Sequence, residues 1–516
     1  MDAAGEADIY LDGTYRIRIT DCNDVLVNDV AKIGSWFSDN LQDTLDNISG
    51  AMDNALKPIL QNLDETINIA AAAGAGANGW DANLVAYGET TQKQINDGLD
   101  SIAQLLSIKN PRSGMRVDIK SYYTPNYALT RPFDNGGGTF VYDDTKANIN
   151  DGGIIINGWV RQDTKQIFAS YFGAKGDGVT NDSPAFQRAV DYCEKNQIKT
   201  LRVGNGNHLL NDKVYFYRGG VNVIGEGALQ REESWIGVSK QNFPDLVQGR
   251  DGDAFTGCSI IVPKNSTAFV FAKSVVDHVF FSMLQFKAKE GRTVGNTNAI
   301  DFFAEFYGPS WGFIITYCHF TGFNKAINIQ SPTQYCVAFV EVSHSAFSQN
   351  DEILYFGDLP QEKWDTVGSR NLAWGLTFEH NRCHDNTRLI RGCFAKDMCR
   401  ISQNNLEGSI PYADGTHPKY AIDLELNNCH VIFEGNHGES IAHNILFASS
   451  FFRKPDGTRH AFANNNTRGS AVNVTLRGNN FDGVYNNIPI TLEGVNIYNY
   501  DAYKVHIHGC SILYDG

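Results

Sequence analysis

An eight-residue pattern that recurs after about residue 200 restricts the possible folds more than any other feature of this chain. It reads apolar, any, apolar, any, any, small or Asn, any, apolar. Its copies begin at Val279, Phe313, Val340, Leu376, Cys399, Val431 (an imperfect copy), Val474 and Val505. Successive copies begin 34, 27, 36, 23, 32, 43 and 31 residues apart. Such a period with variable insertions is typical of a β-solenoid, whereas a propeller has evenly spaced blades.

Each copy of the pattern predicts a strand with an inner and an outer face. Because strand side chains alternate, the first and third positions should point inward and the second and fourth outward. A second apolar strand is predicted after the copies, at Ala299–Phe303, Ala326–Ile329, Ile353–Phe356, Arg388–Ile390, Ala421–Leu426, Asn444–Phe447 and Ile488–Leu492. The sixth position carries Asn381, Asn404, Asn436 and Asn479. Asparagines stacked at a corner bond to neighbouring backbones, so we predict a structural role for them.

The stretch Tyr171–Val190, YFGAKGDGVTNDSPAFQRAV, leads into the solenoid. Its glycines permit a tight turn. Asn181 or Asp182 can cap a following helix, and Pro184 suits the first turn of that helix. A short strand is predicted at Thr200–Val203. A glycine loop before a helix can cradle phosphate, but the spacing here matches neither the dinucleotide-binding nor the Walker motif.

The N-terminal part follows other periods. Strand-like alternation at Ile9, Leu11, Tyr15, Ile17 and Ile19 precedes a helical stripe formed by Ile33, Phe37, Leu41, Leu45, Ile48, Met52, Leu56, Leu60, Leu63 and Ile67. The stripe is narrow and its mean spacing exceeds the heptad value, which favours self-association in a straight or slightly right-handed bundle. Pro58 is predicted to end or kink this helix, and the tract Ala70–Ala77 to break it. A second stripe, Ile95, Leu99, Ile102 and Leu106, predicts another short helix.

Composition excludes several classes of protein. Lys and Arg number 43 and Asp and Glu 58, and the resulting net charge of −15 argues against nucleic acid as the main partner. The ten cysteines show neither a CxxC pair nor metal-ligand spacing with histidine, so we expect no metal or cofactor and interpret them as small buried hydrophobic residues. We find no apolar run long enough for a membrane span and no secretory signal.

Three stretches resemble bacteriophage tailspikes of the pectate-lyase-like right-handed β-helix family. They are FGAKGDGVTND, which resembles the loop and helix that cap the first coil, GGGTFVYD…DGGIIINGWVR, which resembles the small domain before the β-helix, and the helical stripe, which resembles the neck. The resemblance implies a mainly β protein: a right-handed parallel β-helix over residues 168–516, a small β domain over 111–167 and a helical neck over 28–110. Residues 1–27 would be the truncated end of a head-binding or adaptor region.

The resemblance also implies a homotrimer in the phage tail, attached to a tail or baseplate protein through its N-terminus and acting at the host cell surface. The expected activity is binding and depolymerisation of a bacterial capsule or lipopolysaccharide O-antigen, by glycosidic hydrolysis with paired carboxylates. A polysaccharide lyase, a non-catalytic glycan-binding adhesin and a structural spacer remain alternatives, because fold alone does not decide function.

Outward positions of the pattern carry the candidate catalytic residues Glu341, Glu379 and Glu434. If the coils are in register, carboxylates one or two coils apart are separated by about 5–10 Å, which covers both retaining and inverting glycosidases. Insertions at 357–375, 408–419 and 448–471 are expected to build a binding wall. The candidate substrate-binding residues, some of them in the first insertion, are Trp364, Asp365, Trp374, Arg400 and His380.

Two rival sets stay open. Asp301, Asp423 and Glu425 lie on the second strand of their coils, and Asp365 is a loop candidate. A lyase would need a base and an arginine that neutralises a uronate carboxylate, and His380, Arg382, His384 and Arg400 are suitable types.

Overall fold

The computed structural model describes residues 17–20, 26–30, 33–72, 86–87, 90–91, 95–123, 135–227, 258–272, 277–303, 310–330, 337–357, 373–395, 398–427, 429–439, 441, 443–449, 473–482, 490–493, 496–500, 505–508 and 511–512. The chain forms two compact units, Met1–Ala86 with Thr91–Lys93, and Tyr87–Thr90 with Gln94–Gly516. Each unit is described separately below.

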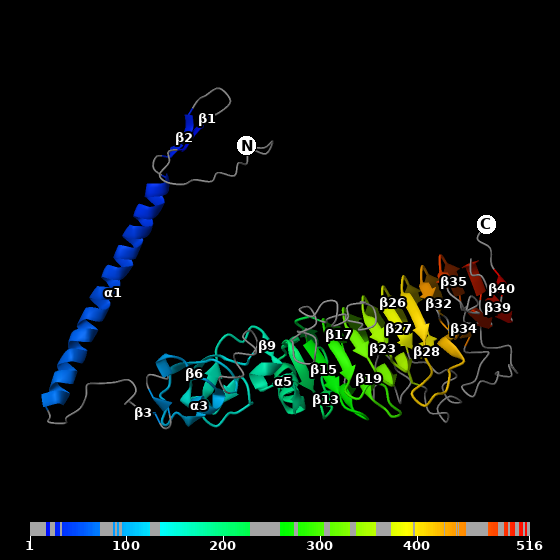
Figure 1. The fold of residues 1–516 in the computed structure, drawn as a ribbon, viewed down its shortest axis with the longest axis horizontal. Coiled ribbons are helices and arrows are strands. Elements are labelled where there is room, and N and C mark those ends of the chain that lie inside the picture. Colours follow the sequence, from blue (N-terminus) through cyan, green and yellow to red (C-terminus); the bar gives the residue numbers. More distant parts are fainter. Residues whose placement is uncertain are drawn as a thin grey trace, which may run out of the picture. The chain divides into compact units, whose positions relative to one another are not determined.

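The first unit contains an antiparallel hairpin, β1 (Ile17–Thr20) and β2 (Leu26–Val30), and the helix α1 (Ile33–Ala72) (Figure 1). The predicted strand positions before Ile17 lie outside the described residues. The prediction that Pro58 ends the helix is wrong, because α1 continues through it to Ala72. A proline removes one backbone hydrogen bond, while the turns on either side keep theirs. The helix does end inside the predicted Ala/Gly tract.

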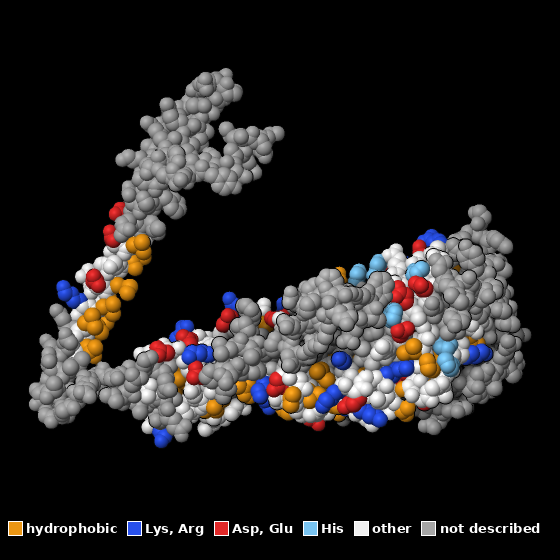
Figure 2. Space-filling view, in the orientation of Figure 1, with side chains coloured by type: hydrophobic (Ala, Val, Ile, Leu, Met, Phe, Trp, Pro, Cys, Tyr) orange, Lys and Arg blue, Asp and Glu red, His pale blue; other side chains and the backbone are white. Residues whose placement is uncertain are grey.

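The apolar stripe of α1 is exposed to solvent. Its described side chains, between 41 and 60 % exposed, are Leu45, Ile48, Met52, Leu56, Ile59, Leu60 and Leu63, and they form one continuous band in Figure 2. An exposed apolar patch of this kind marks an interaction surface, so the expectation that the neck associates with further copies of itself stays a proposal.

We propose that this stripe holds a homotrimer, so changing Leu56 and Leu60 to Asp together should convert the trimer to monomers. Burial of a leucine contributes about 1.5–3 kcal/mol, and the six substituted leucines of a trimer together about 9–18 kcal/mol. Sedimentation velocity at micromolar concentration measures the change. The control, Asn47→Asp with Asn54→Asp, adds the same charge about 200° around the helix from the stripe. A trimer that survives the leucine changes, or a wild-type monomer, would contradict the proposal.

The second unit begins with a small domain. Its antiparallel sheet has the order β5 (Arg116–Ile119), β6 (Gly138–Tyr142), β8 (Trp159–Arg161), β7 (Ile155–Ile156), with a 3-10 turn at Asp144–Lys146. The pair β3 (Ala86–Tyr87) and β4 (Thr90–Thr91) is separate. The helix predicted over Ile95–Leu106 is shorter, α3 (Ile102–Ser107). Ile95, Leu99 and Ile102 pack with the sheet residues Phe140 and Trp159. This stripe therefore belongs to the small domain and not to the neck.

Arg161 joins the small domain to the solenoid entry. The buried guanidinium donates to the carbonyl oxygens of Gly136, Gly137 and Gly153 and stacks 4.0 Å from the centre of the Tyr171 ring. Burial lowers the pKa of Arg161 to about 10. A Cβ atom at Gly137 would lie 2.4 Å from the carbonyl oxygen of Lys120, so only glycine fits at this position of the Gly136–Gly138 run.

The entry stretch forms the predicted loop and helix. A 3-10 turn (Ala169–Phe172) ends at Gly173, with φ of 93°, and β10 (Asp177–Asn181) leads into α5 (Ser183–Lys195), whose first turn contains Pro184. Asp182 occupies the N-cap position, but its side chain does not cap the helix. Its buried carboxylate accepts hydrogen bonds from the backbone of Lys175 and Gly176, each at 2.7 Å, and lies 2.9 Å from Nδ1 of His208. The inner face of α5 covers the first coils.

The solenoid is a parallel β-helix of three sheets (Figure 1). Sheet I contains β9 (Ile167–Phe168), β11 (Thr200–Val203), β14 (Asn222–Gly225), β17 (Asp277–Ser282), β20 (Ser310–Thr316), β23 (Val337–Ser343), β26 (Ala373–Glu379), β29 (Met398–Ser402), β32 (His430–Glu434), β35 (Asn473–Arg477), β38 (Asn496–Tyr500) and β40 (Ser511–Ile512). Sheet II, made of short strands, contains β10, β12 (Gly206–Leu209), β15 (Cys258–Val262), β18 (Gln285–Ala288), β21 (His319–Thr321), β24 (Ala346–Ser348), β27 (Arg382–Asn386), β30 (Asn405–Ser409), β33 (His437–Glu439) and β36 (Asn480–Asp482).

Sheet III completes each coil. It contains β13 (Val214–Phe216), β16 (Thr267–Ala272), β19 (Asn298–Phe303), β22 (Lys325–Gln330), β25 (Glu352–Phe356), β28 (Arg388–Ala395), β31 (Tyr420–Asn427), β34 (Asn444–Ser449), β37 (Ile490–Glu493) and β39 (Val505–His508). These strands include the predicted second strands.

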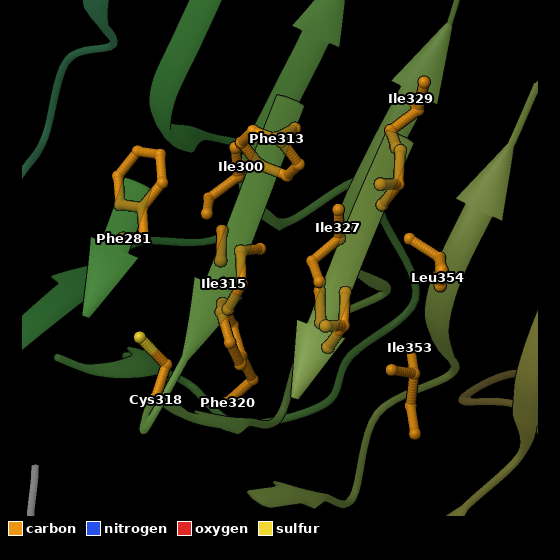
Figure 3. Close-up of a cluster of buried hydrophobic side chains, with 14 of the residues drawn as sticks. Phe281, Ile300, Phe313, Ile315, Cys318, Phe320, Ile327, Ile329, Ile353 and Leu354 are labelled. Carbon is orange, nitrogen blue, oxygen red and sulfur yellow. The ribbon is translucent and has the colours of Figure 1, made fainter. Parts of the chain in front are cut away.

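The repeating pattern is confirmed for its first seven copies, whose first and third positions are all buried. Figure 3 shows Phe281, Phe313 and Ile315 of sheet I among the core side chains contributed by the other strands. The eighth position belongs to a separate strand of sheet II, which the sequence did not distinguish. The copy at Val505 is wrong: β39 pairs with β37 in sheet III, and β38 continues sheet I. Apolar alternation specifies burial on one side of a strand and not which sheet the strand joins.

The asparagine ladder is confirmed at the corner between sheets I and II. The backbone amide of each rung donates to the side-chain oxygen of the next, from Asn381 to Asn404 (2.9 Å), Asn404 to Asn436 (3.1 Å) and Asn436 to Asn479 (3.1 Å). A second ladder, Asn350 and Asn386, lies between sheets II and III and was not predicted. The asparagine side chains therefore supply hydrogen-bond acceptors to buried backbone amides at the corners.

Candidate functional site

The outward face of sheet I brings the predicted glutamates together. Glu379 is in register with Ser343 on one neighbouring coil and Ser402 on the other, and Ser402 is in register with Glu434. Glu379 and Glu434 are therefore two coils, about 9.6 Å, apart. Glu341 lies two residues before Ser343, one coil from Glu379, which separates their Cα atoms by about 8 Å.

Serine hydroxyls hold two of these carboxylates. Ser343 Oγ donates to Glu341 Oε1 at 3.0 Å, and Ser402 Oγ donates to Glu379 Oε2 at 3.3 Å. Ser343 thus neighbours both positions, two residues after Glu341 on its strand and in register with Glu379 on the adjacent strand. Glu434 is instead paired with the exposed Arg477 guanidinium through Nη2 and, at 3.2 Å, Nε. Because Arg477 occupies the Glu434 carboxylate, Glu341 and Glu379 form the more available pair.

The predicted binding residues divide into two groups. Arg400 is in register with Thr377, so it is the diagonal neighbour of both Glu379 and Glu434, and His380 is exposed directly after Glu379. Trp374, on β26, is partly exposed. Trp364 and Asp365 lie outside the described residues. In Figure 2, acidic and histidine side chains gather over the C-terminal part of the solenoid.

The structure places Asp301 far from Asp423 and Glu425, which lie two residues apart on β31. Asp301 and Asp423 share an outward column of sheet III, but they are four coil steps, about 19 Å, apart. Asp301 is held by Thr267, Asn298 and Asn328, and Glu425 is buried.

The residue types suited to a lyase are spread over sheets. Arg382 and His384 lie on β27 of sheet II, where Arg382 approaches Glu407 (3.9 Å) and His384 approaches Asp385 (3.1 Å). Arg400 lies on sheet I. Arg382 and His384 therefore place an arginine and a candidate base two residues apart on sheet II, on a different sheet from the candidate carboxylates.

Two buried acids were missed by the sequence analysis. Asp351 and Glu352 precede and begin β25, each 6 % exposed. Burial raises the pKa of Glu352 despite Arg388, 3.3 Å away, and Arg391, 4.0 Å away. Burial likewise raises the pKa of Asp351. Glu352 Oε2 has no hydrogen-bond partner among the described residues. The sequence did contain a signal for Glu352, because two basic residues, Lys325 and Arg388, are in register with it on the adjacent coils.

These acids anchor the insertion at 408–419. Tyr412 donates to Glu352 at 3.2 Å, and the backbone amide of Ala413 donates to Asp351 at 3.0 Å. Arg292 bonds to Asp351 (3.3 Å), Thr387 (3.1 Å) and the carbonyl oxygen of Pro411. Burial and the neighbouring Glu352 raise the pKa of Tyr412. Because their carboxylates are covered, we interpret the two acids as supports of this insertion.

Comparison with known proteins gives one sequence family. Residues 98–164 match the phage tail protein small four-stranded beta-sheet domain. No curated protein sequence matches the chain. No helix of the described part is long and apolar enough to cross a membrane.

Solved structures with a similar fold include three with low identity. The tailspike protein of Acinetobacter phage vB_ApiP_P1 is 15% identical, with a TM-score of 0.39 over 80% of this chain and 70% of that chain. The enzymatically active domain of bacteriophage CBA120 tailspike protein 2 is 13% identical, with a TM-score of 0.42 over 87% and 59%. Pantoea stewartii WceF, described as a glycan biofilm modifying enzyme with a tailspike-like parallel β-helix, is 14% identical, with a TM-score of 0.45 over 76% and 48%. The chain therefore contains a phage tail domain at residues 98–164, directly ahead of a parallel β-helix.

Proposed function

We propose that this chain is a tailspike that binds and depolymerises a bacterial surface polysaccharide, a capsule or an O-antigen, by glycosidic hydrolysis. The observation that carries the proposal is the pair Glu341 and Glu379, which lie diagonally on one outward sheet face with Ser343 next to both. Paired carboxylates at such a distance are the usual apparatus of glycoside hydrolysis.

In the proposed reaction, Glu379 acts as the general acid and Glu341 as its partner. The Glu379 carboxyl gives its proton to the glycosidic oxygen as the bond from that oxygen to the anomeric carbon breaks. The Glu341 carboxylate takes a proton from the attacking water, whose oxygen forms the new bond to the anomeric carbon. Because water attacks the anomeric carbon directly in this scheme, on the face opposite the leaving group, we propose inversion. The serine hydroxyls orient the two carboxyls.

Arg400 and His380 would contact the sugars on either side of the reacting bond. Both lie next to Glu379, Arg400 by register and His380 by sequence. The choice of hydrolysis over elimination rests on the carboxylate pair of sheet I, because residue types that suit a lyase, such as Arg382 and His384 on β27, are also present. We also propose that the N-terminal hairpin and the neck attach the chain to a protein of the phage tail or baseplate.

The test is to spot the purified full-length chain on lawns of encapsulated and O-antigen-bearing strains. Translucent halos, with new reducing ends and no ultraviolet absorbance of an unsaturated uronate, are expected on a susceptible strain. An unsaturated product would identify a lyase. Adhesion to cells without any released reducing ends would identify a non-catalytic adhesin and overturn the enzymatic proposal.

A further inference from the structure

The corner between sheets I and II carries a row of strained, exposed residues. The fifth position of the repeating pattern is left-handed in seven successive coils, with φ between 49° and 62°: Met283, Tyr317, His344, His380, Gln403, Gly435 and Gly478. Glycine adopts this conformation freely, and a bulky residue such as tyrosine adopts it rarely. Because two coils use glycine here, the turn itself does not require a long side chain. The five coils that have a long side chain at this left-handed position therefore need another explanation.

Three of these side chains form a stack of rings. The Tyr317 and His344 ring centres are 5.2 Å apart, and those of His344 and His380 are 4.8 Å apart with planes 4° from parallel. This spacing follows the rise of about 4.8 Å between coils. Tyr317 is 53 % exposed, and both histidines are exposed. Both faces of His344 lie against a neighbouring ring, and the exposed edges of the stack bear a phenol hydroxyl and imidazole nitrogens.

The backbone under the row is fixed. The amide of His344 donates to the carbonyl oxygen of Glu379, and that of His380 to the carbonyl oxygen of Ser402, each at 3.2 Å. The three ring residues directly follow Thr316, Ser343 and Glu379, which form one column of sheet I. The row therefore runs along the solenoid axis beside the candidate carboxylates, on the side of Glu379 that leads toward the N-terminus.

We propose that Tyr317, His344 and His380 form a subsite for an extended, hydroxyl-rich glycan strand lying parallel to the solenoid axis. Phenol and imidazole groups both donate and accept hydrogen bonds, as sugar hydroxyls do. A donor and acceptor repeated at each coil suits a polymer with a regular sugar repeat better than a folded protein surface. The inference rests on the proposed function for the identity of the ligand, and it adds where the polymer is held and in which direction it runs.

The test uses the full-length chain with Glu379→Gln, so that binding is measured without cleavage. The probe is surface polysaccharide extracted from a strain that the wild-type chain clears or adheres to. Adding Tyr317→Ala and His344→Ala should raise Kd about tenfold, because several hydrogen bonds to the strand are lost. In the chain with an intact Glu379, the same two changes should raise KM about tenfold and leave kcat within about threefold.

Two further variants separate recognition from stability. His344→Phe keeps a ring in the stack and removes its nitrogens, so it should weaken binding and leave the unfolding temperature unchanged. Gln349→Ala, at another exposed left-handed corner with φ of 54°, should change neither. Unchanged Kd in the ring variants, or a loss of thermal stability with unchanged Kd, would overturn the subsite while the halo assay still supports the enzyme. Absence of both adhesion and halos for the wild-type chain would overturn the proposed function itself.

Discussion

Glu379→Gln is expected to lower the rate of glycan cleavage by about 10²–10⁴-fold, the usual contribution of general acid catalysis. Glutamine keeps the shape of the side chain and its bond from Ser402, but it has no proton to give to the glycosidic oxygen. Glycan affinity should therefore survive. The measurement is kcat from released reducing ends, together with Kd for the uncleaved polysaccharide.

The same substitution at three other glutamates supplies controls. Glu341→Gln should be nearly as damaging, because Glu341 is the proposed partner. Glu434→Gln should keep most activity, because that carboxylate is occupied by Arg477. Glu439, an exposed acid on β33 of sheet II, provides the matched neutral change. If Glu379→Gln, Glu341→Gln and Glu434→Gln all retain full halos, the site does not lie on this face. The search then moves to Asp301, Asp423, Glu425 and Asp365.

Asp182→Ala should destabilise the chain by about 3–5 kcal/mol, as expected when one member of a buried polar pair is removed. The substitution leaves the buried amides of Lys175 and Gly176 and the ring of His208 without their acceptor. These groups hold the loop that precedes α5, so the covering of the first coil should loosen with them.

A fall in the urea midpoint and faster trypsin cleavage of the full-length chain would report this loosening. The control is Asp191→Ala on the exposed side of α5, where the carboxylate accepts one bond from Gln187 and a change within about 0.5 kcal/mol is expected. Equal midpoints for wild type and Asp182→Ala would show that the entry loop is held by other contacts.

The sequence predicted the solenoid well because the relevant signals are local. Alternation at Val340 and Val342 reports which side of a strand is buried, and the asparagine at 404 reports a corner. The relation of Glu341 to Glu379 followed from register alone. The helix was not expected to continue through Pro58, but the turns on either side keep their hydrogen bonds. The strand at Val505 was assigned to the repeating pattern because apolar alternation does not specify which sheet a strand joins.

The support of the insertion was not predictable in the same way. Asp351 meets Arg292 and Ala413 only after two coils have closed and the chain has returned, so no spacing in the sequence encodes these contacts. Likewise, stacking of Tyr317 on His344 depends on a left-handed corner that no composition rule identifies for these residue types. Contacts that depend on several coils at once require the three-dimensional arrangement.

The anchoring of the insertion at 408–419 has a consequence for exchange between phages. A loop that contacted only its own coil could be transplanted alone. The insertion at 408–419 is instead hydrogen-bonded to Arg292, Asp351 and Thr387, which belong to earlier coils. The smallest segment that carries the insertion together with its contacts is therefore the block from about residue 292 to 419. A chimaera with a crossover inside that block should receive the insertion without the residues that hold it in place.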